Sequence, residues 1–400
     1  MPRVVITGAG TINALGHDVP STFEALAQGR GGIGPLDIPD VDRLTNRVAA
    51  QVRNWTATEH FDLRGLSLYD RMTQFVLWSA RQAVAQSGLV FDEALALRAG
   101  VVLGTAGGGL GTIDDSYRAV YADGKNRVHP LTVPRLMASA GVSHISMTYG
   151  LRGPAFSVST ACASSNHAMG LAFQMVRSGA APVMLTGGAE AMLTFGGLKA
   201  WEGLRVMSND ACRPFSADRN GMVQGEGAAV FVFEAYKHAK ARGANILAEV
   251  VGFSMCSDAH DIVMPSTDGA MRAMRGALED AGLEPGQVGY INAHGTGTKA
   301  NDANEAAAIR AVFGSAPPLV SSTKAAHGHI IGGTGAVEAL ACLMALREGV
   351  IAPTLGHRQA DPLCALDVVP NTARQARVDV AMSNAFAFGG LNAVLVLRRM

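Results

Sequence analysis

One segment, residues 156–176, constrains the fold more than any other, because its pattern changes from strand to helix at Cys162. Apolar and β-branched residues lead into a run of small ones, and apolar residues then recur at helical spacing: Ala168, Leu171, Ala172, Met175 and Val176. This pattern predicts a buried strand that turns into a helix at the cysteine. Free N–H groups and the helix dipole favour an anion there, so we expect the thiol pKa to fall below the ~8.5 of a free cysteine. An inert, buried cysteine is the alternative, and the rest of the chain argues against it.

Composition excludes several classes of function. The 400 residues carry 33 Lys and Arg against 33 Asp and Glu, so no overall charge draws the chain to nucleic acid or to an anionic membrane. No run approaches the ~20 apolar residues of a membrane-spanning helix, and the N-terminus lacks the pattern of a signal peptide. The cysteines are scattered and odd in number, which fits neither a disulfide framework nor a zinc site and predicts a cytoplasmic protein: Cys162, Cys212, Cys256, Cys342 and Cys364.

Apolar segments alternate with glycine-rich turns, which predicts an α/β fold with many tight strand-to-helix connections. The expected strands are residues 4–6, 101–103, 182–186, 228–233 and 288–293, and the expected helices are 20–28, 70–87 and 235–242. Residues 112–149 have few strand signals, so we expect an insertion that covers the site or forms a subunit contact.

A weak internal repeat divides the chain near residue 245. VVLGTAGGG, FSVSTACASSNHAMG and VMLTGGAEAM in residues 1–245 correspond to VGYINAHGTG, PLVSSTKAAHGHIIGGTG and VAMSNAFAFGG in residues 246–400. Each pair is a strand that runs into a turn of small residues. Since ligands bind at the carboxyl ends of strands in open α/β folds, two packed halves are expected to bring these turns into one cleft.

The second half places three reactive side chains just after strands. His294 follows the strand 288–293 and precedes a Gly-Thr-Gly-Thr turn, while Lys324 and His329 lie in STKAAHGHIIGG. Glu338, nine residues after His329 on the next predicted helix, is placed to pair with the Lys324 ammonium if the loop turns back.

Three other interpretations of these motifs fail. GAGTINALG lacks the third glycine of a dinucleotide-binding loop, because Asn13 stands there. Ser321 and Lys324 match the S-x-x-K motif of penicillin-recognising enzymes, but this serine ends a strand instead of opening a helix. His327 and His329 are not joined by a carboxylate or cysteine at metal-ligand spacing, so we expect no metal.

Four motifs, STACASSNHA, NAHGTGT, SSTKAAHGHIIGG and SNAFAFGGLNAVL, resemble in sequence and order the β-ketoacyl-acyl-carrier-protein synthases, condensing enzymes of the thiolase superfamily. The resemblance covers nearly the whole chain and is strongest to the nodulation protein E-type and polyene-type synthases. It implies a homodimer of thiolase-like protomers, each a duplicated α/β fold with five αβαβα layers. It also implies substrates carried on the phosphopantetheine of acyl carrier protein, with no further cofactor.

The same resemblance assigns roles to single residues. It implies that Cys162 accepts the acyl group, that His294 and His329 serve malonyl decarboxylation, and that Lys324 with Glu338 keeps the histidines in their working protonation state. Backbone N–H groups of Cys162 and Phe388 would form the oxyanion hole, and Phe388 would gate access. The candidates for contact with substrate are Thr296 and Thr298 in the phosphopantetheine tunnel, together with Gly107, Phe386 and Asn392.

Some positions depart from the family pattern. Ala387 and Leu391 replace a glycine and a threonine of the gate loop, so we expect altered gating. Gly107 replaces a bulky residue that faces the acyl pocket, which indicates room for a longer or stiffer acyl chain, and His327 replaces a hydroxyl or small residue. The cations expected to meet an acidic carrier protein are few: Arg64, Arg71, Arg127 and Arg205.

The resemblance leaves rival activities to weigh. A thiolase would carry a second cysteine in the last motif, where Phe386 and Phe388 stand instead, so condensation is favoured over thiolysis. A Cys-His acyl-thioester hydrolase would need one base and a water path. A chain-length factor would lack Cys162, although a catalytic subunit paired with such a partner stays open. Chain length, unsaturation and pathway, in fatty-acid, polyunsaturated acyl or polyene biosynthesis, are not determined by the sequence.

Overall fold

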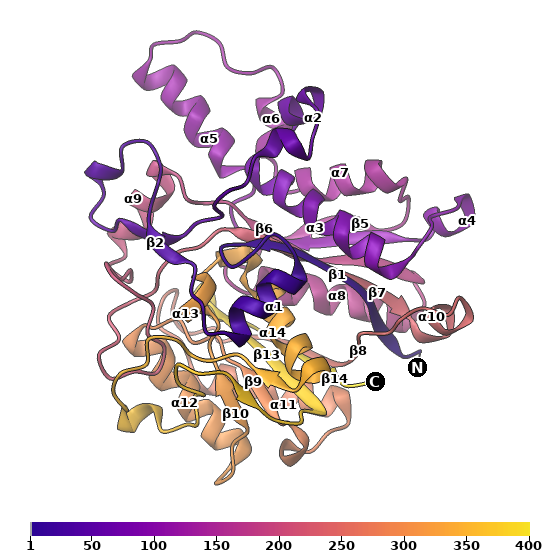
Figure 1. The fold of residues 1–400 in the computed structure, drawn as a ribbon, viewed down its shortest axis with the longest axis vertical. Helices are drawn as coiled ribbons and strands as arrows, with labels where there is room; N and C mark the ends of the chain where they lie inside the picture. The colour runs from indigo at the N-terminus through magenta and orange to yellow at the C-terminus, as the bar shows by residue number, and fades with distance from the viewer. Residues whose placement is uncertain (1) are drawn as a thin grey trace.

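The computed structural model describes residues 2–400, and its framework is one ladder of ten strands (Figure 1). The strand order is β10-β9-β13-β14-β8-β1-β7-β6-β4-β5. The bounds are β1 Val4–Asn13, β4 Gly100–Gly104, β5 Ala155–Val158, β6 Val183–Glu190, β7 Gly227–Ala235, β8 Ala248–Ser257, β9 Tyr290–Asn292, β10 Leu319–Ser321, β13 Val380–Ala387 and β14 Leu391–Arg398.

The strand order has an internal symmetry centred on the pair β1 and β8, which is antiparallel. On one side β5, β4 and β6 run parallel and β7 then turns antiparallel. On the other side β10, β9 and β13 run parallel and β14 turns antiparallel. The strands of the three repeated sequence motifs therefore occupy equivalent places in the two halves of the ladder.

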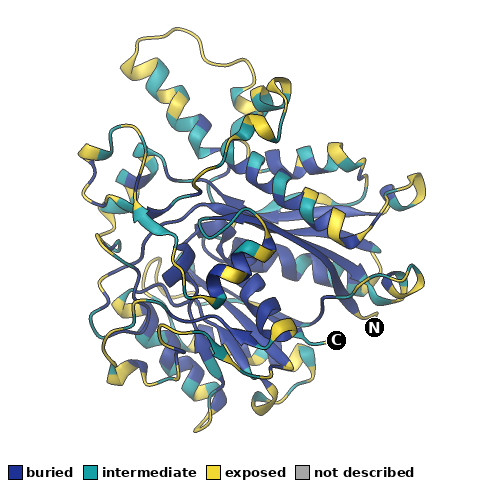
Figure 2. Ribbon diagram, in the orientation of Figure 1, coloured by how far each residue is buried: buried dark blue, intermediate teal, exposed yellow. Residues whose placement is uncertain are grey.

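Helices separate and cover these two halves. α8 (Ser164–Ser178) and α14 (Thr334–Glu348) both contact strands of each half, and thirteen consecutive residues of α14, from Thr334 to Leu346, are buried (Figure 2). A helix that is apolar on every side belongs inside a core. α3 (Arg71–Ser87) and α7 (Ala140–Tyr149) pack on the outside of the first half, and α11 (Thr267–Ala281) and α12 (Lys299–Phe313) on the second. The result is the five-layered α/β fold that the resemblance implies.

The N-cap and C-cap residues of α3 show how the sequence determines where one of these helices begins and ends. The Asp70 side chain accepts a hydrogen bond from the N–H of Met72 and caps the N-terminus, and Gly88 ends the helix at a φ of 66°. The remaining helices are α1 Val19–Ala27, α2 Leu63–Leu68, α4 Glu93–Ala96, α5 Leu110–Tyr117, α6 Thr132–Leu136, α9 Phe195–Gly203, α10 Tyr236–Ala241 and α13 Lys324–His327. Two small ribbons pair β2 (Ile33–Pro35) with β3 (Val48–Ala50) and β11 (Val350–Ile351) with β12 (Arg374–Gln375).

Two expectations about strands need correction. β1 runs on to Asn13 instead of ending at residue 6, because its whole length is covered by neighbouring elements. β5, which leads to Cys162, is not a buried strand, because it lies at the edge of the ladder with Ala155 exposed and the next three residues half-buried.

The segment from α5 to α6 projects from the body of the protein and is mostly exposed (Figures 1 and 2). It falls inside the insertion that the sequence predicts at residues 112–149, which contains helices and no strand of the described ladder. None of the helices built from residues 2–400 combines the length and apolar character that crossing a membrane requires.

Candidate active site

Cys162 lies on a sharp turn between the end of β5 and the start of α8. Ala161, just before it, adopts a φ of 47°, which is unusual for a residue with a Cβ. The hydroxyl of Ser164 closes the turn by accepting the N–H of Thr160 and donating to the carbonyl of Ala161. Gly104 makes room for this turn, because a Cβ there would lie 2.3 Å from the backbone of Ser164. The backbone at Cys162 is thus held in one conformation.

The thiol pKa differs from the expectation. Burial raises the pKa of Cys162 to about 12, although the Lys324 charge and the N–H groups of Phe388 and Cys162 itself act in the opposite direction. The expected lowering is therefore wrong for the free protein, because loss of hydration outweighs the helix dipole at a side chain that is 5% exposed. The same two N–H groups that act on the sulfur are those that the resemblance assigns to an oxyanion hole.

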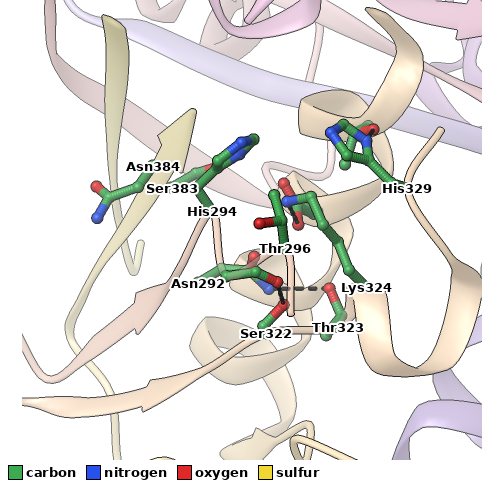
Figure 3. A network of polar contacts seen from close by, with 12 residues as sticks. Asn292, His294, Thr296, Ser322, Thr323, Lys324, His329, Ser383 and Asn384 are labelled. Atoms are coloured by element: carbon green, nitrogen blue, oxygen red, sulfur yellow. Dashed lines mark hydrogen bonds and ion pairs between the residues drawn. The ribbon is translucent and has the colours of Figure 1, made fainter. Parts of the chain in front are cut away.

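Cys162 shares one cavity with both predicted histidines. The cavity has a volume of about 160 Å³, and its lining includes Cys162 from the first half with His294 and His329 from the second. The two imidazole rings are 5.6 Å apart between centroids and nearly perpendicular. His294 follows β9 and His329 follows α13, and Figure 3 shows both side chains near Thr296 and Lys324. One small site therefore contains a thiol and two imidazoles.

Hydrogen bonds determine which nitrogen of His329 carries the proton. Its Nδ1 accepts the N–H of Ile331 at 3.0 Å and lies 2.9 Å from the hydroxyl of Thr334. Burial, and next the Lys324 charge, hold the pKa of His329 well below 6.5, so the ring is neutral. A neutral imidazole whose Nδ1 accepts must carry its proton on Nε2. His329 therefore offers an N–H donor from Nε2.

His294 is fixed through its backbone. Glu305 on α12 accepts the N–H groups of His294 and Gly295 at 2.8 and 2.7 Å, and burial raises the pKa of this carboxyl to about 7. Within residues 2–400, the His294 Nδ1 has no hydrogen-bond partner. Burial and the Lys324 charge also hold the pKa of His294 well below 6.5, so both rings in the cavity are neutral.

Lys324 and Glu338 form a fully buried ion pair, as the sequence anticipates. The Nζ of Lys324 donates to Oε1 of Glu338 at 2.6 Å, and both side chains are 0% exposed. The Lys324 charge contributes to the pKa shifts of Cys162, His294 and His329. One cation therefore favours both the anionic thiolate and the neutral imidazoles.

The loop after β13 forms another wall of the cavity. Phe388 lines it, and its ring stacks on Trp201 of α9 with 6.1 Å between centroids. The N–H of Gly389 donates to the carbonyl of Ile262 at 2.8 Å, which joins this loop to residues 258–266. Ala387 has an ordinary extended φ of −96°, whereas Gly389 and Gly390 have positive φ values of 79° and 67°. The loop thus needs glycine at 389 and 390 rather than at 387.

The structure brings most of the predicted substrate contacts to this cavity, but two lie elsewhere. Thr296, Thr298 and Phe386 line the cavity. Asn392 instead donates to Oδ1 of Asp258 at 2.6 Å. Gly107 is outside the lining as well, and a Cβ there would lie 3.2 Å from the terminal methyl of Met192. The space expected beside Gly107 is therefore occupied by the Met192 side chain.

Two residues of the site were missed by the sequence analysis. Glu190 is buried at the end of β6 and accepts N–H groups from Ala106, Gly107 and Gly332, so it joins the loops of the two halves. Its position at the end of a buried strand was a usable signal. Trp201 gave no comparable signal, because only the folded chain brings α9 against Phe388. No group of three or more His, Cys, Asp or Glu within residues 2–400 is placed to hold a metal ion.

Comparisons with known proteins agree with this geometry. The family model "Beta-ketoacyl synthase, N-terminal domain" matches residues 1–239, and "Beta-ketoacyl synthase, C-terminal domain" matches residues 247–358. Nodulation protein E of Rhizobium sp. (strain N33) is 47% identical over 401 residues, which cover 100% of this chain and 99% of that protein. The 3-oxoacyl-[acyl-carrier-protein] synthase 2 of Staphylococcus aureus (strain COL) is 40% identical over 406 residues, covering 99% and 98%. A solved structure of the ishigamide ketosynthase/chain length factor superposes with a TM-score of 0.94 at 37% identity, covering 100% and 99%.

Proposed function

This chain belongs to the β-ketoacyl synthase family, and we propose that it joins an acyl primer to a malonyl unit by decarboxylative Claisen condensation. Both substrates are carried on the phosphopantetheine of acyl carrier protein, and the product is a 3-oxoacyl thioester two carbons longer than the primer. The observation that supports this function is the shared cavity of Cys162, His294 and His329.

In the first step the Cys162 sulfur attacks the carbonyl of the acyl thioester. The tetrahedral oxyanion is held by the backbone N–H groups of Cys162 and Phe388, and loss of one such donor costs about 3 kcal/mol in similar sites. The bond to the pantetheine sulfur then breaks, and the proton of the cysteine thiol ends on that sulfur. Because the proton only moves from the sulfur of Cys162 to the sulfur of pantetheine, the high pKa of Cys162 is compatible with acyl transfer.

In the second step the malonyl thioester loses carbon dioxide. The electron pair of the broken carbon–carbon bond moves onto the thioester oxygen, where neutral His294 and His329 donate hydrogen bonds to the enolate. The enolate carbon then attacks the acyl-Cys162 carbonyl, and the carbon–sulfur bond breaks to release the 3-oxoacyl product. The resulting thiolate takes a proton from water. Burial, and next the charge of Lys324 in its pair with Glu338, keep both imidazoles neutral throughout.

Replacement of the nucleophile tests these assignments. In Cys162→Ala we expect no acyl group on the protein by intact-mass measurement, while carbon dioxide release from malonyl-carrier protein continues, because that step uses the histidines. A His294→Ala variant serves as the opposite control, with loading kept and decarboxylation lost. Normal acyl loading of Cys162→Ala contradicts the assignment of the nucleophile. Free acid in place of the 3-oxoacyl product would identify a hydrolase.

The partners belong to the same proposal. An acidic carrier protein can bind to three exposed arginines, Arg64, Arg127 and Arg205. The guanidinium of Arg71 is not free in this way, because it donates hydrogen bonds to both carboxylate oxygens of Glu226. β5 lies at the edge of the ladder, where a second copy can pair with it. The similarity to a ketosynthase/chain length factor keeps a heterodimer as a second candidate, and condensation by the purified chain alone excludes it.

Substrate range and compartment complete the proposal. All five cysteines are free, which is typical of the reducing cytoplasm. The Met192 side chain fills the space beside Gly107, so a longer or stiffer acyl chain that reached this space would have to displace the flexible thioether. A panel of acyl-carrier proteins of graded length and unsaturation measures this preference directly.

A further inference from the structure

One buried histidine, His327, stands two residues before His329 and has no part in the chemical steps described above. It is the last residue of α13 and is 1% exposed. It does not line the cavity formed by the described residues. Both nitrogens of this buried ring are hydrogen-bonded close to His329, which suggests that the ring serves the site.

The hydrogen bonds of His327 define its protonation. Its Nδ1 lies 2.8 Å from the carbonyl oxygen of Gly328, which can only accept, so Nδ1 carries a proton. Burial, and then the Lys324 charge, lower the pKa of His327 to about 3, so the ring is neutral and Nε2 is an acceptor. The hydroxyl of Thr323, 3.0 Å from Nε2, therefore donates to it. Because both nitrogens are engaged, neither is available to a metal.

This histidine is the last side chain in a directed series of hydrogen bonds that starts at Asn292, the last residue of β9. The amide of Asn292 on β9 donates to the Thr323 hydroxyl at 3.1 Å, a bond drawn in Figure 3 below the two catalytic rings. Thr323 donates to His327, and His327 donates to the carbonyl of Gly328. Thr323 and His327 each accept a hydrogen bond on one side and donate one on the other, an arrangement in which the bonds polarise and strengthen one another.

This series ends on the peptide group that joins Gly328 to His329. Its carbonyl accepts from His327, and its N–H, which belongs to His329, donates to the carbonyl of Val223 at 2.7 Å. Gly328 has a φ of 68°, and a Cβ there would lie 2.8 Å from the Cβ of Ala50, so the turn requires glycine. Because glycine has wide backbone freedom, these two hydrogen bonds, with the one from the Gly328 N–H to the Lys324 carbonyl at 2.9 Å, help to hold the peptide group in place.

We propose that His327 is a positioning residue, which holds the Gly328–His329 peptide plane so that the His329 imidazole meets the malonyl thioester. The proposal rests on the proposed function. It places the effect on decarboxylation and not on acyl transfer to Cys162, which uses backbone donors from other loops. A displacement of about 1 Å at a reacting group commonly costs about a hundredfold in rate.

Three substitutions separate the two hydrogen bonds. The amide nitrogen of His327→Asn replaces Nδ1 and keeps the bond to Gly328. The amide oxygen of His327→Gln replaces Nε2 and keeps only the bond from Thr323, and His327→Leu removes both at similar volume. We expect the Asn variant to decarboxylate malonyl-carrier protein within about threefold of wild type. The Gln and Leu variants are expected to lose about tenfold to a hundredfold in kcat with KM unchanged. All three should load Cys162 normally.

Several outcomes overturn the proposal. Wild-type decarboxylation in His327→Leu would do so, as would equal losses of loading and decarboxylation, or an Asn variant as impaired as Gln. Nitrogen-15 NMR of histidine-labelled protein adds a readout independent of activity. We expect a neutral His327 with its proton on Nδ1, and a His329 signal that changes in His327→Leu but not in His327→Asn. A wild-type protein that releases no carbon dioxide overturns the proposed function itself.

Discussion

At the residue scale, backbone strain is found beside the groups proposed to react. Ala161 precedes Cys162 with a φ of 47°, and Ile331, whose N–H donates to the His329 ring, has a φ of 45°. Such values cost about 1–3 kcal/mol each and persist only where the surroundings enforce them. Tight packing does so here, because a Cβ on Gly332 would lie 2.4 Å from the N of Ala106. The positions of the thiol and the imidazole are thus imposed by the fold.

The buried ion pair gives a pH-dependent prediction. Lys324→Met leaves Glu338 without its counter-charge, so burial raises the pKa of Glu338 still further above its ordinary 4.5. A carboxyl with a raised folded pKa binds more protons folded than unfolded, so its penalty is absent at low pH and grows as pH rises. We expect a loss of about 3–5 kcal/mol in unfolding free energy at pH 8 and a smaller loss at pH 5, measured by urea denaturation.

A matched control for this prediction is Lys240→Met, at an exposed lysine on α10. It should change the unfolding free energy little and equally at both pH values. An identical loss at pH 5 and pH 8 in Lys324→Met would show that Glu338 does not titrate in the folded protein.

At the element scale, Gly390 is the glycine of the loop after β13 at which a side chain would clash. Gly390 has a φ of 67°, and a Cβ there would lie 2.5 Å from the Cβ of Asp258. Gly390→Ala should therefore displace the loop that carries Phe388 and lower kcat/KM for the acyl-carrier protein by about tenfold or more. Ala387→Gly, at an ordinary extended φ, is expected to stay within about twofold of wild type. A larger change in Ala387→Gly than in Gly390→Ala would support the gating effect first expected from Ala387.

Many helices and strands were predictable from the sequence because their signals are local, but the end of β1 was not. The helix expected at residues 70–87 is α3, and the strand expected at 288–293 places His294 just after β9. The Cys162 pKa was mispredicted because the local dipole argument omits burial by the other half of the chain. The contact of Trp201 with Phe388, and that of Met192 with Gly107, likewise arise only from tertiary packing. Residues that act through distant contacts were the ones the sequence left out.

At the scale of the whole molecule, the strand order supports a duplication that we propose to divide at residue 245. β5, β4, β6, β7 and β1 in residues 1–245 correspond to β10, β9, β13, β14 and β8 in residues 246–400. The cavity contains Cys162 from the first half and both histidines from the second, so neither half holds the site alone. Because the reacting residues come from both halves, the proposed reaction depends on how the two halves pack together.

The free edge of β5 predicts self-association. The carbonyl groups of Pro154 and Val158 accept from β4, so the N–H and C=O of Ala155 and Ser157 point away from the ladder. Exposed edges of this kind invite a second strand, and apolar side chains are exposed in the neighbouring insertion: Tyr117, Tyr121, Val133 and Met147. We expect a dimer by light scattering, which Ala155→Pro weakens by removing one outward N–H, while Ala155→Ser keeps it. A dimer unaffected by the proline would place the contact on another surface.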